Sequence, residues 1–172
     1  MTLNTFCSHC GLKFAEQKLY PRKCFSCGND TYRNPIPVAV GIIPVEIADT
    51  IGIVILQRGN EPSKGEWALP GGYIEYGETW QDGLAREIKE ELGWDLDAEF
   101  HIQGVENSTG NNLILFGQCK PFGNLPEFIP NEEALAVRLY TDINEELAFP
   151  THTAYARRAL TSLIAFYSGS FV

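Results

Sequence analysis

Residues 72–94 read GYIEYGETWQDGLAREIKEELGW, and this stretch decides how the chain is interpreted. Thr79 is a favourable helix N-cap, Asp82 completes a weak capping box with it, and Gly93 is a typical C-terminal stop. At about 100° per residue, one apolar stripe runs along the segment between these signals. Its members are Leu84, Ile88 and Leu92. The stretch therefore predicts an amphipathic helix over about Thr79–Leu92 that packs on a core.

Three carboxylates of this helix, Glu87, Glu90 and Glu91, lie at i, i+3 and i, i+4 and share the arc beside the stripe. Like charges at this spacing destabilise a helix by roughly 0.2–0.5 kcal/mol per pair. A solvated face would explain an ordinary charge run. Clustered carboxylates also suit hard cations such as Mg²⁺ or Mn²⁺. Because a glycine-rich segment, LPGGYIEYGE, precedes them, the combination favours a divalent-metal site for phosphate chemistry.

The composition of the 172-residue chain is that of a globular protein, with 44% hydrophobic and 20% charged residues. Its 13 basic and 22 acidic side chains give a formal net charge of −9. That balance argues against a nucleic-acid partner, because phosphate backbones favour basic surfaces. A small anionic substrate remains compatible, since a divalent metal can bridge carboxylates and phosphates. No secretory signal and no membrane-spanning apolar run is visible, so we expect a cytoplasmic chain without membrane contact.

Four of the five cysteines form two CxxC pairs thirteen residues apart. They are Cys7, Cys10, Cys24 and Cys27. Two such pairs can place four thiolates tetrahedrally around one ion, with Zn²⁺ expected and iron as the minor alternative. Four protein ligands close the coordination sphere, so the spacing predicts a structural metal. Two chance pairs of buried thiols would be the alternative, but paired CxxC motifs at this distance are specific.

The rest of the chain alternates strand-like and helix-like segments. Runs rich in β-branched residues predict strands at Val38–Val45, Ile51–Arg58, Ala98–Val105, Leu113–Cys119 and Ala136–Tyr140. A second helix is expected from about His152 to Tyr167, and a Gly/Pro-rich loop covers Gly59–Gly72. We therefore expect an α/β or α+β sandwich with a mixed β-sheet in residues 35–172, and a small metal-binding module in residues 1–34.

The order Gly72-x5-Glu78-x7-Arg86-Glu87-Ile88-x-Glu90-Glu91-x-Gly93-Trp94 resembles the Nudix box, G-x5-E-x7-R-E-U-x-E-E-x-G-U, where U is apolar. Every fixed position matches; Trp94 stands where an aliphatic residue is usual. The lead-in also resembles the family's R…G.W.LPGG pattern, through Arg58, Pro62, Gly65, Trp67, Leu69, Pro70 and Gly71. Together with the cysteine module, the resemblance covers nearly the whole chain and implies a Nudix α/β/α sandwich behind a zinc ribbon.

The resemblance implies hydrolysis of a nucleoside diphosphate linked to another moiety, assisted by Mg²⁺ or Mn²⁺. By position, Glu90 and Glu91 are the main metal ligands, and Glu87 is a third ligand or the base. The carbonyl of Gly72 also faces a metal. Two further roles follow by position: Glu78 acts on the metal-bound water, and Arg86 orients Glu87 through an ion pair.

The segment PNEEALAVRLY, residues 130–140, offers a further carboxylate. Glu132 and Glu133 occupy a region where some Nudix members carry an additional catalytic or metal-binding glutamate, and loop surface is the equally weighted alternative. We expect Glu133 to be the catalytic one of the two.

The substrate is the least specified part of the resemblance. Segments such as FCSHCG and EALAVRLYTDINEELAFP look like the ADP-ribose and FAD pyrophosphatases that carry an N-terminal ribbon, so we expect AMP as a product. NADH pyrophosphatases are the alternative, but this chain lacks their Ser-Gln-Pro-Trp-Pro-Phe-Pro run. Arg58 is a candidate phosphate contact, with a surface charge as its alternative. Trp67, Tyr73, Tyr76 and Trp80 are candidates for stacking on a base, and packing is as good an explanation for each.

Two other functional classes follow from the same residues. A nucleotide-sensing protein that does not turn over its ligand usually has a broken box, whereas this box is intact. An enzyme acting on capped RNA ends would suit the zinc ribbon but not the net charge of −9. We expect a homodimer, as is common for relatives with this architecture, and we assign no role to His101 or His152.

Overall fold

The computed structural model describes residues 5–15, 20–48, 50–108 and 111–168. The chain divides into two compact units, one up to Pro35 and the other from Ile36 onward. The expected domain boundaries, with a small metal-binding module in residues 1–34 and an α/β domain in residues 35–172, stay a prediction.

The first unit is held by little regular structure. Strands β1 (Arg22–Lys23) and β2 (Asp30–Thr31) pair antiparallel, and an isolated bridge joins Phe6 to Lys13. Gly11 and Gly28 each follow the second cysteine of a pair and have φ values of +73° and +74°. Glycine suits both positions because left-handed backbone disfavours side chains. The two CxxC pairs therefore sit in two tight turns of similar geometry.

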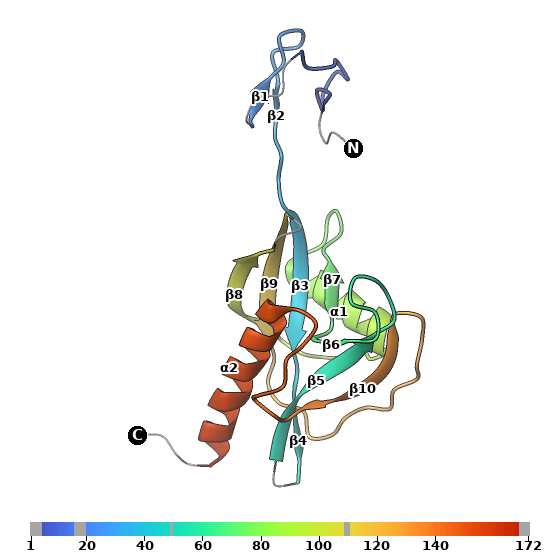
Figure 1. Cartoon of the computed structure of the whole chain (residues 1–172), viewed down its shortest axis with the longest axis vertical. Helices are drawn as coiled ribbons and strands as arrows, with labels where there is room; N and C mark the ends of the chain where they lie inside the picture. Colours follow the sequence, from blue (N-terminus) through green and yellow to red (C-terminus); the bar gives the residue numbers. More distant parts are fainter. Residues whose placement is uncertain (1–4, 16–19, 49, 109–110, 169–172) are drawn as a thin grey trace. The chain divides into compact units, whose positions relative to one another are not determined.

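In its described residues, the second unit has two helices and eight strands, whose arrangement Figure 1 shows. The strands are β3 (Ile36–Ile42), β4 (Pro44–Ile47), β5 (Thr50–Arg58), β6 (Trp67–Ala68), β7 (Gly71–Tyr73), β8 (His101–Asn107), β9 (Asn112–Gln118) and β10 (Ala134–Tyr140). The helices are α1 (Trp80–Leu92) and α2 (Pro150–Tyr167). None of the helices in the described ranges combines the length and apolarity of a membrane span.

Two four-stranded sheets share the long β3–β4 segment. One sheet has the order β7-β3-β9-β8, in which β3 and β9 run parallel and the other neighbours antiparallel. The other has the order β10-β5-β4, with β6 also paired to β5, and all its pairs are antiparallel. The predicted mixed sheet with flanking helices is therefore confirmed.

The sheets bury both faces, because alternate residues of a strand point to opposite sides. Val40 and Ile42 of β3 belong to a core cluster that includes Ala156 and Leu160 of α2. Their neighbour Ala39 belongs to a second cluster with the apolar stripe of α1. In β5 the alternation repeats: Ile53 and Ile55 lie in the first cluster, Val54 and Leu56 in the second. Helix α1 covers one face and α2 the other, which is the expected helix–sheet–helix sandwich.

Several element boundaries differ from those expected. The run Val38–Val45 forms two strands, which part at Ile43 just before Pro44, a residue without a backbone N–H. The strand expected from Ala98 begins at His101, and the glycine-rich loop contains β6 and the start of β7. Helix α2 begins at Pro150 rather than His152, because proline is well suited to the first turn of a helix.

Candidate active site

Helix α1 has the caps that its sequence predicts. The Thr79 hydroxyl accepts a hydrogen bond from the Asp82 N–H at 3.2 Å, and Gly93 ends the helix with φ = +75°. Leu84, Ile88 and Leu92 are fully buried, so the apolar stripe faces the core as expected. The register of α1 is thereby fixed, and with it the direction in which its carboxylates project.

Arg86 joins two of these carboxylates to Glu78, which precedes the helix. Its Nε donates to Glu78 Oε1 at 2.9 Å, and its Nη1 donates to Glu87 at 2.9 Å and to Glu90 at 3.1 Å. Its Nη2 donates to the Tyr73 carbonyl at 2.8 Å, which ties the helix to the end of β7. The hydrogen bond from Arg86 is the main cause of the lowered pKa of Glu78. One guanidinium thus offsets much of the like-charge repulsion on this helix face.

Glu91 is the buried acid of the group, with 7% of its surface exposed. Its Oε2 accepts a hydrogen bond from the Gly71 N–H at 2.8 Å. Burial, together with smaller contributions from the charges of Glu87 and Glu133, raises its pKa to about 8. A carboxylate buried beside two others is costly unless a cation compensates it. The donor set is all oxygen, which fits a hard divalent ion such as Mg²⁺ or Mn²⁺.

The glycine-rich segment lies against these carboxylates. A Cβ placed on Gly72 would be 2.3 Å from the carboxylate carbon of Glu87, which no ordinary contact allows. Gly71 has φ = +142°, and a Cβ there would be 2.2 Å from the Ala39 carbonyl oxygen. Only glycine lets the backbone pass this close to both α1 and β3. The predicted approach of Gly72 to the carboxylate cluster is thus present.

Asn131, which the sequence reasoning overlooked, connects a second loop to the same cluster. Its Nδ2 donates to the carbonyls of Glu90 at 3.2 Å and Glu91 at 3.0 Å, at the end of α1. Its Oδ1 accepts from the N–H groups of Glu133 at 2.9 Å and Ala134 at 2.8 Å. Glu133 therefore lies near the helix carboxylates, where its charge also raises the pKa of Glu87.

A cavity of about 520 Å³ opens beside the glycine segment. Its wall is formed by Val38, Val40, Arg58, Glu61, Pro62, Gly71, Gly72, Tyr73, Ser108, Asn112, Ile114, Phe149 and His152. The volume lies in the range typical of small-molecule sites. The aliphatic residues Val38, Val40 and Ile114 come from β3 and β9, whereas the charged and polar side chains come from strand ends, from the loop after β5 and from the start of α2. The cavity therefore offers an apolar floor with polar groups around it, next to the carboxylates.

Two of the expected substrate contacts line this cavity. Arg58 donates from Nε to the Pro62 carbonyl at 2.8 Å, and its guanidinium carbon lies 5.2 Å from the centre of the Phe149 ring. Tyr73 is 56% exposed and also lines the cavity. Both side chains are therefore placed where a ligand in the cavity would meet them.

The other aromatic candidates have different surroundings. Trp67 is not among the described lining residues; it packs against the core cluster next to α2, with Arg138 at 4.3 Å from its ring centre. The Trp80 ring lies so close to Gly117 that a Cβ there would be 2.5 Å from it. Tyr76 is fully exposed. Trp67 and Trp80 thus have packing environments, although a contact of Trp67 with substrate stays a prediction.

His152 lines the cavity although the sequence suggested no role for it. It is 7% exposed, and its Nδ1 accepts a hydrogen bond from the Leu69 N–H at 3.2 Å. Its ring meets Phe116 edge to face, with 5.7 Å between ring centres, and lies 4.9 Å from Phe149. Burial lowers its pKa to about 3, with a smaller contribution from Arg58. Only the fold reveals this residue, because its backbone partner is 83 positions away.

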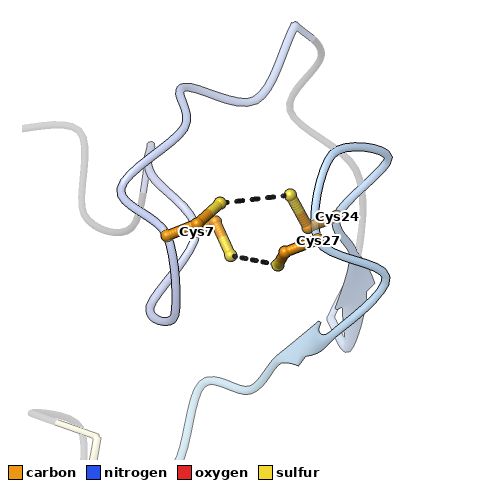
Figure 2. Close-up of side chains that lie close together, drawn as sticks. Cys7, Cys24 and Cys27 are labelled. Atoms are coloured by element: carbon orange, nitrogen blue, oxygen red, sulfur yellow. Dashed lines mark hydrogen bonds between the residues drawn. The ribbon is translucent and has the colours of Figure 1, made fainter.

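The four paired cysteines converge in the first unit (Figure 2). All four sulfur atoms lie within 4.8 Å of one another, and the Cys7–Cys27 and Cys10–Cys24 pairs are 3.7 Å apart. A tetrahedral zinc site with bonds of about 2.3 Å separates its sulfurs by roughly 3.8 Å. Backbone N–H groups of Cys10 and His9 lower the pKa of Cys7 to about 6, which favours its thiolate. The cluster is compatible with one structural zinc ion.

Curated relatives resemble this chain over different lengths. An ADP-ribose pyrophosphatase of Methanocaldococcus jannaschii is 44% identical over 62 residues, which are 36% of this chain and 34% of the relative. An NAD-capped RNA hydrolase, NudC of Stutzerimonas stutzeri, is 26% identical over 164 residues, or 93% of this chain and 56% of the relative. The chain thus matches about a third of the first relative and just over half of the second.

A solved structure and a family model agree on the second unit. The crystal structure of a NUDIX hydrolase from Nitrosomonas europaea is similar with a TM-score of 0.67 and 25% identity, covering 92% of this chain and 91% of that one. Residues 35–157 match the NUDIX domain. They contain the helix, the glycine segment and the Asn131 loop described above. The chain therefore belongs to the Nudix family of pyrophosphohydrolases.

Proposed function

We propose that the chain hydrolyses the pyrophosphate bond of a nucleoside diphosphate linked to another moiety, with ADP-ribose or FAD as substrate and AMP as a product. One observation carries the proposal: the buried Glu91 lies beside Glu87 and Glu133 where a cavity of about 520 Å³ begins. A relative named as an ADP-ribose pyrophosphatase supports the first substrate.

The carboxylates of Glu90 and Glu91, with Glu87 or Glu133, would hold Mg²⁺ or Mn²⁺, and the Gly72 carbonyl would add a ligand. When bound, such ions neutralise phosphate charge and make water more acidic. Glu91 is already deprived of water and receives one N–H bond, so its free oxygen is available to a cation. The tight approach of Gly72 to Glu87 keeps the backbone beside these ligands.

Proton transfer needs a carboxylate that is not fully neutralised by Arg86. Glu87 and Glu133 both fit, because burial raises the pKa of Glu87 and Glu133 lies close enough to raise it further. Glu78 bonds Arg86 through both of its oxygens, at 2.9 and 3.2 Å. We therefore assign Glu78 first to orienting Arg86, which in turn positions Glu87; an action of Glu78 on the attacking water stays a prediction.

Recognition of the substrate would use the cavity wall. Arg58 supplies the positive charge suited to a diphosphate, and its contact with the Pro62 carbonyl holds it at the cavity edge. Tyr73 offers an exposed ring for stacking on adenine or flavin.

A dinucleotide such as NADH is the second candidate substrate. It is favoured by the relative named NAD-capped RNA hydrolase, which aligns with 93% of this chain. The missing aromatic run after the box disfavours it. A nucleotide-sensing role without turnover is a third reading, and the complete set of box residues speaks against it.

The first unit would serve as a zinc ribbon that stabilises the chain. A module this small buries too little apolar surface to fold alone, so a metal would supply the missing stability. We expect about one equivalent of zinc per chain, a homodimer and a cytoplasmic location. Metal analysis and light scattering of the purified protein test the first two.

Product analysis tests the proposed activity. The protein is incubated with ADP-ribose, FAD, NADH and nucleoside triphosphates, each with Mg²⁺ or Mn²⁺, and the products are separated. AMP with ribose 5-phosphate or FMN is expected from wild type and from Glu127→Gln, which changes an exposed glutamate, but not from Glu90→Gln. Preferred cleavage of NADH would replace the substrate assignment. Tight nucleotide binding without any turnover would refute the hydrolase.

A further inference from the structure

We propose that His152 contacts the substrate: its Nε2–H donates a hydrogen bond into the cavity, to a neutral acceptor on the base or sugar of the nucleotide. The inference deepens the proposed function, because it concerns recognition in the same cavity. Nothing in the box motif points to this residue, which lies at the start of α2, 58 positions after the end of the box at Trp94.

The tautomer of His152 follows from its backbone partner. The Leu69 N–H can only donate, so Nδ1, at 3.2 Å from the Leu69 nitrogen, must present its lone pair. The proton of the neutral ring then sits on Nε2. Burial and the nearby charge of Arg58 both oppose a second proton and hold the pKa at about 3. Throughout the neutral pH range the ring therefore presents one donor, Nε2–H, and no net charge.

The direction of this donor follows from the ring's surroundings. Phe116 meets the imidazole edge to face and Phe149 is tilted against it, which limits rotation about χ2. Among the described residues, no side-chain nitrogen or oxygen is sealed from solvent without a partner. Within the described part of the chain, Nδ1 has a hydrogen bond and Nε2 has none, so Nε2 must reach open space. The cavity that His152 lines is that space.

The wall around His152 indicates what it would bind. Val38, Val40 and Ile114 form the apolar part of the cavity, and such a surface suits a ring system or a sugar face. Arg58 supplies the only cationic side chain among the described lining residues, so the phosphates belong near it. A neutral donor in an apolar wall discriminates strongly, because a ligand without an acceptor would leave Nε2–H unpaired. We therefore assign His152 to recognition of the base or sugar of the substrate, and not to recognition of the diphosphate charge.

Two substitutions separate this contact from the structural bond. His152→Asn places an amide oxygen near the position of Nδ1, so it can still accept from Leu69, but it has no group at Nε2. His152→Gln places its amide near Nε2, so it can donate into the cavity, but it leaves the Leu69 N–H without its acceptor. The proposal predicts opposite phenotypes for the two variants.

For His152→Asn we expect a near-wild-type melting temperature, an unchanged kcat and a KM raised about tenfold, the effect of one lost hydrogen bond. For His152→Gln we expect a lower melting temperature and a KM within about twofold of wild type. Wild-type KM in His152→Asn would overturn the proposal. So would a fall in melting temperature of both variants together with an equal rise in KM, since that pattern indicates a structural role only.

Product binding keeps the test independent of catalysis. AMP, ribose 5-phosphate and FMN can be titrated calorimetrically, because none of them is turned over. We expect His152→Asn to bind one of these probes with about tenfold lower affinity than wild type and the others with unchanged affinity. The weakened probe identifies the moiety that His152 contacts. If wild type hydrolyses none of the four substrates, the proposed function fails, whereas these titrations still decide the role of His152. Unchanged affinity for every probe that wild type binds would refute the contact.

Discussion

Replacing Glu91 by glutamine should stabilise the protein when divalent metal is removed. The side chain is 7% exposed and its pKa is raised from 4.5 to about 8, mainly by burial. A carboxyl group whose pKa is higher in the folded than in the unfolded state supports folding below pH 4.5. That support is lost as the pH rises towards 8. Glutamine keeps an oxygen for the Gly71 N–H but has no proton to lose, so it removes this penalty.

The size of the effect follows from the two pKa values. At pH 7, about 2.5 pH units above the unfolded-state value, keeping Glu91 in its buried position costs about 3 kcal/mol at about 1.4 kcal/mol per unit. For a chain of this size, that difference raises the melting temperature of Glu91→Gln by roughly 6–12 °C. Well below pH 4.5, for example at about pH 3.5, the two proteins should melt at similar temperatures, because Glu91 is then protonated in both the folded and the unfolded state.

Thermal unfolding at several pH values measures this difference. A mild cation-exchange resin removes Mg²⁺ and Mn²⁺ while leaving the thiolate-bound metal in place. Adding Mg²⁺ should then raise the melting temperature of wild type more than that of Glu91→Gln, since the variant lacks one of the carboxylate ligands of the proposed site. Glu127→Gln serves as the control for removing one surface charge. A variant that melts below wild type at pH 7 without metal, or that responds equally to Mg²⁺, would refute the reasoning.

Substitutions at four further positions test separate parts of the molecule. In Gly72→Ala the new Cβ would meet the end of the Glu87 side chain at 2.3 Å, so kcat should fall at least about tenfold with little loss of stability, because Glu87 moves aside. Gly59→Ala would instead meet a backbone oxygen at 1.9 Å and should cost more than about 2 kcal/mol in chemical denaturation; equal stability of the two variants would contradict this contrast. Asn131→Ala removes four hydrogen bonds and should lower the free energy of unfolding by about 2–4 kcal/mol in the same assay, with Asn131→Asp losing less; no loss would mean that water replaces these bonds. Cys24→Ser should release most of the zinc in a chromophoric metal assay, and full retention of zinc would exclude the four-thiolate site.

The parts of the molecule that local sequence determines were predictable. The α1 helix, its Thr79 cap and its Gly93 stop depend on residues within one short segment, and the structure has all three. The cysteine spacing likewise predicted that the four sulfurs converge. In both cases the interacting groups are near in sequence or belong to a repeated motif.

The features of the site that the sequence did not predict depend on contacts between residues far apart in the chain. Asn131 bonds the end of α1 from 40 and 41 positions away, and His152 reaches Leu69 across 83 positions. Neither residue belongs to a pattern that a periodicity or a motif would single out. The run Val38–Val45 divides just before Pro44. That a proline interrupts strand pairing could be predicted from the sequence, but not that the two halves would join two different sheets. The part of the cavity wall at the start of α2, at Phe149 and His152, was therefore beyond local reasoning, whereas Arg58, Tyr73 and the carboxylate helix were not.

The late position of α2 in the chain has a consequence for synthesis. Residues from β3, the glycine segment and α1 emerge from the ribosome before α2, and they already carry most of the proposed acidic ligands. Phe149 and His152 of the cavity wall, and Leu160 of the cluster that packs on β3 and β5, emerge later. A nascent chain that ends after β10 therefore exposes one face of its sheets, which makes it a client for chaperones. Nucleotide capture should begin only once α2 has docked.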